Sequence, residues 1–179
     1  ALAQSHSEGR TFLVTESLFS MDGDVAPLKS YAELTEKHGA YLIVDDAHAT
    51  GVFGEARGSG LTEAFEIEKR AVAILSTFGK ALGLFGAFIA GPQLMIEYLI
   101  NRSRPFIFTT AVPPLLLYGI EAALDRLEAE PQRRRRVSDL ADRLRAHLSR
   151  GNLNTLNSSG PIVPVLLEES ELALKVAAG

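Results

Sequence analysis

The chain has 179 residues, 46% of them hydrophobic, and a formal net charge of −4. This length suits one domain of ordinary size, or one domain with a piece of another. The slight negative charge gives no general attraction to nucleic acid or to acidic membranes, and the absence of cysteine excludes disulfides and thiolate metal sites. No apolar run reaches membrane-spanning length and residues 1–6 lack a signal-peptide core, so we expect a cytoplasmic protein.

The first half of the chain predicts a parallel pair of strands. Residues 10–15 and 41–44 are apolar runs without clean alternation, which indicates strands buried on both faces. Between them, Pro27 is placed to open a helix and Gly39 to close it. The order strand, helix, strand implies a right-handed crossover and parallel strands.

The second half adds two more strands and several helices. The sequence predicts strands at 71–76 and 87–90, and the short link between these two favours an antiparallel step. The remaining elements are predicted as a short helix or turn at 61–65, helices at 93–101, 113–127 and 131–150, an extended segment at 102–110, a polar junction at 151–160, a strand at 161–167 and a helix from 169. Arg133 to Arg136 are predicted to form a solvated helix face, because acidic residues surround them.

Three polar clusters follow three of these strands. They are Glu16 to Ser20, Asp45 to His48 and Thr77 to Lys80. A parallel sheet brings the carboxyl ends of its strands to one edge, where open α/β folds place their ligands. An acid, a histidine, a hydroxyl and a lysine that converge at one edge are what pyridoxal phosphate chemistry needs, since the lysine forms a Schiff base and the acid keeps the ring nitrogen protonated.

Other phosphate and metal sites are less consistent with the sequence. The segment around Gly79 and Lys80 is not an NTPase phosphate loop, because Ala81 replaces the required hydroxyl residue. The glycine-rich segment 54–60 lacks the dinucleotide-binding spacing. A metal-dependent hydrolase using Asp45, Asp46 and His48 remains an alternative, although no second histidine lies at ligand spacing. For Asp46, Asp22 and Asp24 the plain interpretation is loop capping and turn formation.

Four segments together resemble a known family. Glu16 to Leu28 (ESLFSMDGDVAPL), Val44 to Val52 (VDDAHATGV), Thr77 to Gly83 (TFGKALG) and Arg104 to Pro114 (RPFIFTTAVPP) are similar to the α-oxoamine synthases. The resemblance implies a fold-type I pyridoxal phosphate enzyme that joins an amino acid to an acyl thioester and releases CO2. Within this family, the sequences of the four segments are most similar to the biotin-pathway branch, which condenses L-alanine with a pimeloyl thioester to give 8-amino-7-oxononanoate.

The resemblance also implies roles for individual residues. Lys80 corresponds to the Schiff-base lysine, Asp45 to the partner of the pyridine nitrogen and His48 to a hydrogen-bond partner of the ring's phenolic oxygen. Thr77 would bind the phosphate and Ser20 would lie near the phenolic oxygen.

The remaining implications concern partners and domains. The family forms homodimers with the active site at the interface, and Thr110 or its neighbour Thr109 would reach the partner subunit's phosphate. The acyl group would come from acyl-CoA or an acyl-carrier protein, and neither nucleic acid nor membrane is expected as a partner. We expect an α/β fold with a mostly parallel sheet flanked by helices: residues 1–150 form the C-terminal portion of the cofactor-binding large domain, and residues 151–179 begin a small α+β domain.

Two alternative functions remain open at this point. The 2-amino-3-ketobutyrate ligase (glycine C-acetyltransferase) branch is hard to separate from the biotin branch, and an inactive chain acting as an interaction module is a further alternative. The chain is about half the family's length and both ends look cut, so we expect it not to turn over substrate by itself.

Overall fold

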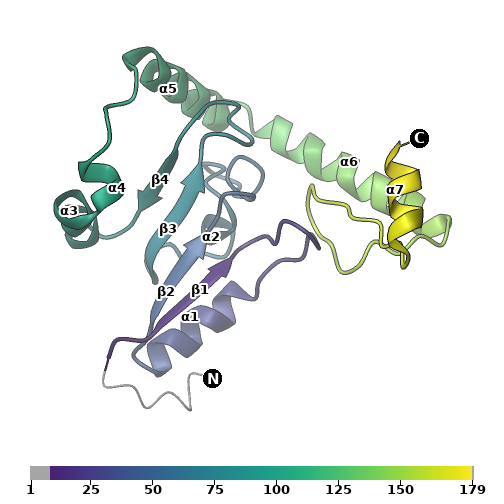
Figure 1. Ribbon diagram of the computed structural model, residues 1–179, viewed down its shortest axis with the longest axis horizontal. Coiled ribbons are helices and arrows are strands. Elements are labelled where there is room, and N and C mark those ends of the chain that lie inside the picture. The colour runs from purple at the N-terminus through teal and green to yellow at the C-terminus, as the bar shows by residue number, and fades with distance from the viewer. Residues whose placement is uncertain (1–8, 179) are drawn as a thin grey trace.

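The computed structural model describes residues 9–178, so the segment inspected for a signal peptide lies outside the described residues. In the described part, four strands form one sheet in the order β1 (Phe12–Glu16), β2 (Tyr41–Asp45), β3 (Ala71–Thr77) and β4 (Ala87–Ala90). β1, β2 and β3 are parallel, and β4 runs antiparallel to β3 (Figure 1). The predicted α/β class, the parallel crossover and the antiparallel last strand are all confirmed.

One face of the sheet is packed against helix α1 (Leu28–Lys37), and this face holds the core. Leu42 and Val44 of β2 are fully buried there, because alternate residues of a strand point to the same face. The helix ends at His38, and Gly39 follows with φ +63°, a left-handed conformation that glycine adopts at little cost. The opposite face of β2, with Ile43 and Asp45, is only half-buried, so the prediction of a strand buried on both faces is wrong for this chain.

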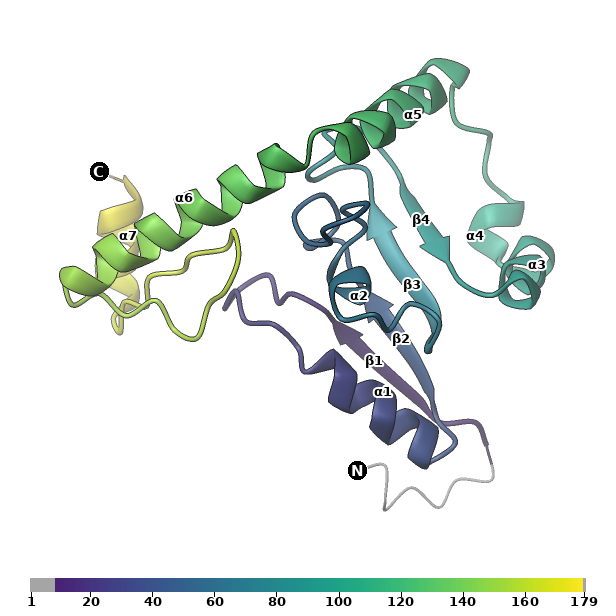
Figure 2. The ribbon, with the colours of Figure 1, turned by 180° about the vertical axis from the view of Figure 1, so that it is seen from behind.

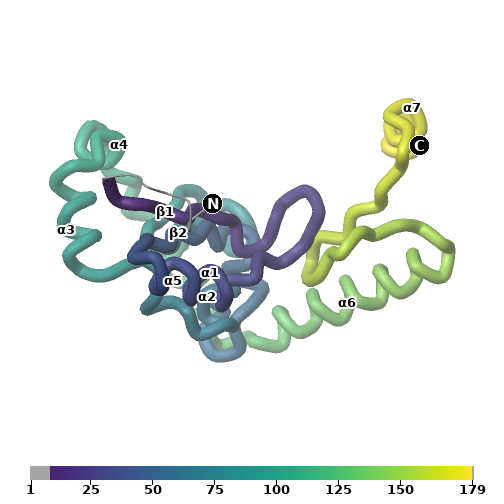
Figure 3. Tube along the Cα trace, turned by 90° about the horizontal axis from the view of Figure 1, so that it is seen from below, coloured from purple at the N-terminus to yellow at the C-terminus, as the bar shows by residue number. Residues whose placement is uncertain are grey.

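The remaining helices lie around and beyond the sheet. They are α2 (Leu61–Ala64), α3 (Gln93–Arg102), α4 (Arg104–Ile107), α5 (Pro114–Ala129), α6 (Pro131–Arg150) and α7 (Ser170–Ala178). α3 and α4 lie beside β4 in both views (Figures 1 and 2). α6 extends away from the sheet, and α7 overlaps its far end in these views but stands apart from α6 in Figure 3. None of the helices within residues 9–178 combines the length and apolar character needed to cross a membrane.

Two predictions of local structure are wrong. The segment 102–110, predicted as extended, contains the short helix α4, and Pro105 occupies a first-turn position where its missing N–H is not needed. The segment 161–167, predicted as a strand, is irregular. A strand needs a neighbouring backbone to complete its hydrogen bonds, and the hydrogen bond from Leu166 N to Asn154 O at 2.8 Å does not amount to such a ladder.

The four arginines at the start of α6 do not all belong to a solvated face. Arg134 is only 6% exposed, and its guanidinium donates to Leu127 O and, at 3.1 Å, to Glu55 O. Arg133 and Arg135 do lie at the surface and pair with acidic side chains. A helix presents different faces at successive residues, so a run of like charges can contain one residue that points inward.

The C-terminal segment returns to the loop between β1 and α1. Ser159 N donates to Gly23 O at 2.7 Å, and a side chain at Gly23 would meet Ile162 O at 2.6 Å. Figure 3 shows this return of the chain from the end of α6. Arg145 of α6 supports it by donating to Ser158 Oγ at 3.3 Å and Gly160 O at 3.1 Å. The loop that carries Ser20 is therefore attached to the segment that follows α6.

Candidate active site

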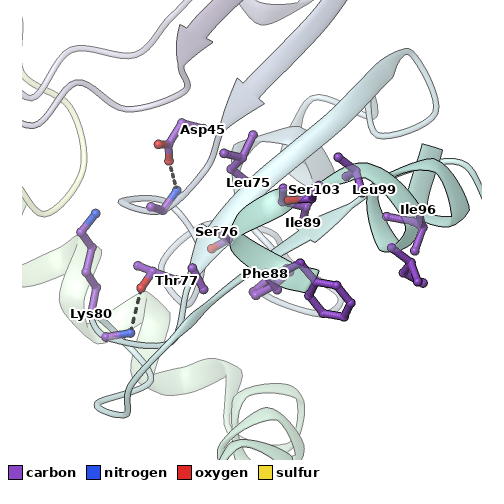
Figure 4. A pocket seen from close by; sticks show the side chains of 15 residues that line it. Asp45, Leu75, Ser76, Thr77, Lys80, Phe88, Ile89, Ile96, Leu99 and Ser103 are labelled. Carbon is purple, nitrogen blue, oxygen red and sulfur yellow. Dashed lines mark hydrogen bonds between the residues drawn. The ribbon is translucent and has the colours of Figure 1, made fainter. Parts of the chain in front are cut away.

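A cavity of about 910 Å³ opens at the end of the sheet where β2 and β3 finish. Its polar wall comes from the strand ends and the loops after them, including Asp45, Ser76, Thr77 and Lys80. Its apolar wall is formed by side chains of β3, β4, α3 and α4, namely Leu75, Phe88, Ile89, Ile96, Leu99, Ile100 and Phe106. The close view in Figure 4 shows the polar and apolar groups around one space. A largely apolar cavity with a few convergent polar groups is the usual form of a small-molecule site.

Asp45 lies on the wall of this cavity because it is the last residue of β2 on the open face of the sheet. Its Oδ1 accepts a hydrogen bond from Ala47 N at 3.0 Å, which fixes the side chain against the following turn. A carboxylate has about four lone-pair sites, so Asp45 retains the capacity to accept a hydrogen bond from a bound cation or N–H group.

Thr77 is the last residue of β3, and Lys80 lies in the loop that joins β3 to β4. Thr77 Oγ1 donates to Gly86 O at 2.8 Å and accepts from Gly79 N at 3.1 Å, so it closes the loop on both sides. Lys80 is exposed at the cavity, and its side chain extends toward the end of β2 that carries Asp45 (Figure 4). Of the polar groups expected to converge on one cleft, Asp45, Thr77 and Lys80 do line the same cavity, whereas His48 and Ser20 are not among the described residues that line it.

The other predicted site residues lie elsewhere in this chain. His48 is half-buried in the turn after β2 and is not one of the described residues that line the cavity. Ser20 lines a separate hollow of about 330 Å³ on the β1–α1 loop, together with Asp22 and Asp24. Thr110 is exposed between α4 and α5, and the hydroxyl of Thr109 donates to its carbonyl oxygen at 3.4 Å.

Asp46 lies on the opposite side of the backbone from Asp45. It is fully buried, and its carboxylate accepts hydrogen bonds from the first backbone N–H groups of α2, those of Leu61 and Thr62. Asp46 thus has a structural role, as the plain interpretation expected, but its side chain caps a helix 15 residues away rather than its own loop. In this position Asp46 cannot join Asp45 and His48 in binding one metal ion.

Sequence reasoning missed Ser76 as a residue of the cavity wall. Ser76 is 3% exposed, and its hydroxyl donates to Thr50 Oγ1 at 2.7 Å. It directly precedes Thr77 in β3, so the same strand-end argument could have included it.

The family model described as aminotransferase class I and II matches residues 1–178. A protein of Anaeromyxobacter dehalogenans named 8-amino-7-oxononanoate synthase is 45% identical over 169 residues, which are 94% of this chain and 42% of that protein. A protein of the same name from Geobacter sulfurreducens is 43% identical over 175 residues, or 97% of this chain and 44% of that protein. The chain thus spans less than half the length of these curated relatives.

Solved structures agree with this relationship. The serine palmitoyltransferase of S. paucimobilis, solved with bound PLP–myriocin, is 32% identical and superposes with a TM-score of 0.89 over 96% of this chain and 45% of that one. The 8-amino-7-oxononanoate synthase of Francisella tularensis is 30% identical, with a TM-score of 0.84 over 96% of this chain and 50% of that one.

Proposed function

Because this chain belongs to the aminotransferase class I and II family, we propose that it carries the cofactor-binding lysine of a pyridoxal phosphate-dependent α-oxoamine synthase. The observation that carries the proposal is the shared cavity of Lys80, Asp45 and Thr77 at the ends of β2 and β3. The family relationship and the shared cavity both support the proposal.

The residues around the cavity suit pyridoxal phosphate in kind. Lys80 offers the amine that would hold the aldehyde and Asp45 the acceptor for a protonated ring nitrogen. Thr77 offers a hydroxyl that would exchange its bond to Gly86 O for one to the phosphate. When bound, the cofactor supplies an electron sink for a carbanion next to its ring. The protein's contribution is to place a carboxylate, an amine base and a hydroxyl that binds the phosphate around that ring.

Asp45 and Lys80 would have separate tasks in the reaction. The negative charge of Asp45 favours a proton on the ring nitrogen, since a charge-assisted hydrogen bond is roughly twice as strong as a neutral one. The amine of Lys80 would hold the cofactor and would be the base that takes the α-proton of the amino acid substrate. His48, Ser20 and Thr110 are proposed as further cofactor contacts, for which support comes from the family resemblance.

The substrates proposed are L-alanine and a pimeloyl thioester, with 8-amino-7-oxononanoate and CO2 as products. The names of relatives at 43–46% identity support this branch, whereas the serine palmitoyltransferase structures are 28–32% identical. We further propose a homodimer, a cytoplasmic location and a boundary at residue 150 between the large domain and the start of the small one.

The test is cofactor loading of the whole enzyme, followed by borohydride reduction. Lys80→Ala is expected to abolish the reducible visible band, and Lys69→Ala, which changes another lysine outside the cavity, is expected to leave it intact. Loaded enzyme should release CO2 faster from L-alanine with pimeloyl-CoA than from glycine with acetyl-CoA. A reducible band that survives Lys80→Ala would refute the proposed lysine, and a preference for glycine with acetyl-CoA would move the protein to the other branch.

A further inference from the structure

Asp46 is a fully buried acid that the proposed reaction does not use directly. We infer that Asp46 is a positioning residue, which holds the turn after β2 so that Asp45 stays on the cavity wall. This inference rests on the proposed function, since it assigns Asp46 a role in the chemistry at Asp45.

The side chain of Asp46 is held by four donors from two other elements. Ser17 Oγ, at the end of β1, donates to Oδ1 at 2.5 Å, and Leu61 N donates to the same oxygen at 3.1 Å. Thr62 donates to Oδ2 twice, from its backbone N at 3.0 Å and from its Oγ1 at 2.6 Å. All of these residues are buried, so water does not compete for the carboxylate.

The backbone of Asp46 is anchored as firmly as its side chain. Its N–H donates to Leu75 O of β3 at 2.8 Å, and its carbonyl oxygen accepts from Ala49 N at 3.0 Å and Thr50 N at 2.8 Å. Asp45, the preceding residue, is therefore fixed between the β2–β3 hydrogen bonds and this anchored turn. A shift of Asp46 must move Asp45, because the two share a peptide plane.

An amide cannot replace this carboxylate without disturbing the turn. In Asp46→Asn, one oxygen becomes an NH2 group that meets either the Thr62 N–H or the Leu61 N–H, and two donors cannot pair. Gly60 packs so closely on the carboxylate that a Cβ at this residue would lie 2.3 Å from Asp46 Oδ2, so the side chain has little room to rearrange without the backbone. We therefore expect the turn, and Asp45 with it, to move.

The decisive measurement is exchange of the α-proton of L-alanine with D2O by the cofactor-loaded enzyme, without acyl thioester. Rates are divided by the number of borohydride-reducible sites, so loss of folded or loaded protein does not lower them. Asp46→Asn is expected to lower the rate by about 10²-fold, the loss that a misplacement of about 1 Å can cause. A merely structural role would leave the rate per loaded site unchanged, and that result would overturn the inference.

A double-mutant cycle then asks whether Asp46 acts through Asp45. Asp45→Asn by itself should load cofactor and lose most of the exchange rate. If Asp46 only positions Asp45, adding Asp46→Asn to Asp45→Asn should lower the rate by less than threefold further. Two full, multiplicative losses would mean that Asp46 acts independently, which overturns the inference.

Milder variants keep the test valid if Asp46→Asn does not fold or load. Thr62→Val removes the hydroxyl that donates to Oδ2, whereas Thr62→Ser retains it, so the rate should fall about tenfold in the first and stay near normal in the second. Asp139→Asn, at an exposed position on α6, is the matched control for removing a charge. Equal rates for the two Thr62 variants would count against the positioning role.

A measurement without cofactor separates failure of this inference from failure of the proposed function. In the cofactor-free protein, Asp46→Asn or Thr62→Val should speed hydrogen–deuterium exchange of the amides of Ala49 and Thr50 by about tenfold or more, with little change in β4. Faster exchange in a protein that never binds cofactor would refute the proposed function but would still show that Asp46 holds the turn after β2. Unchanged exchange would show that Asp46 does not hold this turn, which overturns the inference.

Discussion

Two adjacent acids of the same sequence motif have opposite environments. Asp45 stays on the open cavity wall, and Asp46 is enclosed by donors from β1 and α2. Burial of a carboxylate is costly unless its lone pairs are satisfied, and the structure meets this requirement at Asp46 with four hydrogen bonds. Of these two neighbouring acids, Asp45 is therefore available to a ligand, whereas Asp46 stabilises the fold.

Glu63 of α2 is a second acid held by the loop around it. Burial alone would raise its pKa, but the hydroxyl of Ser59 and the backbone N–H groups of Arg57, Ser59 and Ala56 donate to the carboxylate and lower the pKa to about 2. Because the side chain is only 11% exposed, solvent screens these contacts weakly. The carboxylate fixes the loop between the β2 turn and α2.

This depressed pKa predicts a pH dependence of stability. The folded value lies below the ordinary 4.5, so the stabilisation is fully present above pH 4.5 and is lost as the pH falls toward 2. At neutral pH it amounts to about 3 kcal/mol. Urea unfolding of the wild type and of Glu63→Gln should differ at pH 7 and converge near pH 2. A difference independent of pH would show that the Glu63 charge does not stabilise the fold.

At the scale of elements, the approach of the 54–60 loop to the β2 turn depends on glycine. Gly60 has φ +128°, and a Cβ there would lie 2.3 Å from Asp46 Oδ2. Gly39, after α1, also has a positive φ of +63°, but nothing lies within 4 Å of its Cβ position. Comparison of the two glycines thus distinguishes the cost of a positive φ from the cost of steric overlap between an added Cβ and its neighbours.

Substitution of each glycine by alanine measures that difference. Gly39→Ala should lower the free energy of unfolding by about 1 kcal/mol, the cost of a left-handed conformation. Gly60→Ala should cost roughly 2–4 kcal/mol, because the added methyl also displaces the Asp46 carboxylate. Chemical denaturation of both variants gives the comparison. Equal losses would mean that the β2 turn can move away from the loop, which the hydrogen bonds of Asp46 argue against.

Across the whole molecule, two arginines of α6 hold this helix to the 54–60 loop and to the returning C-terminal segment. Near its start, Arg134 reaches back to the carbonyl oxygens of Leu127 and Glu55 and packs beneath Gly58. Farther along, Arg145 contacts Ser158 and Gly160, which belong to the returning C-terminal segment. Because α6 otherwise extends away from the sheet, these contacts set its direction (Figure 1).

The importance of Arg134 can be measured against a neighbour on the same helix. Arg134→Met keeps most of the side-chain packing but leaves two carbonyl oxygens without a donor, so unfolding should become easier by about 2 kcal/mol. Arg136→Met, at an exposed position, should change stability by less than about 0.5 kcal/mol. Denaturant midpoints report both effects. If the two variants were equally stable, the buried guanidinium would not be needed to hold α6.

The sequence alone was sufficient to predict the parallel sheet, the antiparallel last strand and the meeting of Asp45, Thr77 and Lys80. Each of these follows from local rules: apolar runs form strands, a helical crossover makes neighbouring strands parallel, and a short link reverses direction. Because parallel strands end at one edge, the residues at the ends of β2 and β3 come to the same cavity.

Tertiary structure alone decided which neighbours become buried and which predicted elements form. The burial of Asp46 and Arg134 depends on donors and acceptors contributed by α2 and the 52–60 loop, which no local pattern specifies. The segment 161–167 has the composition of a strand but is irregular, because a strand requires a partner backbone. Likewise, Ser20 and Thr110 lie apart from the cavity, since the positions of loops depend on long-range packing rather than on the residues within them.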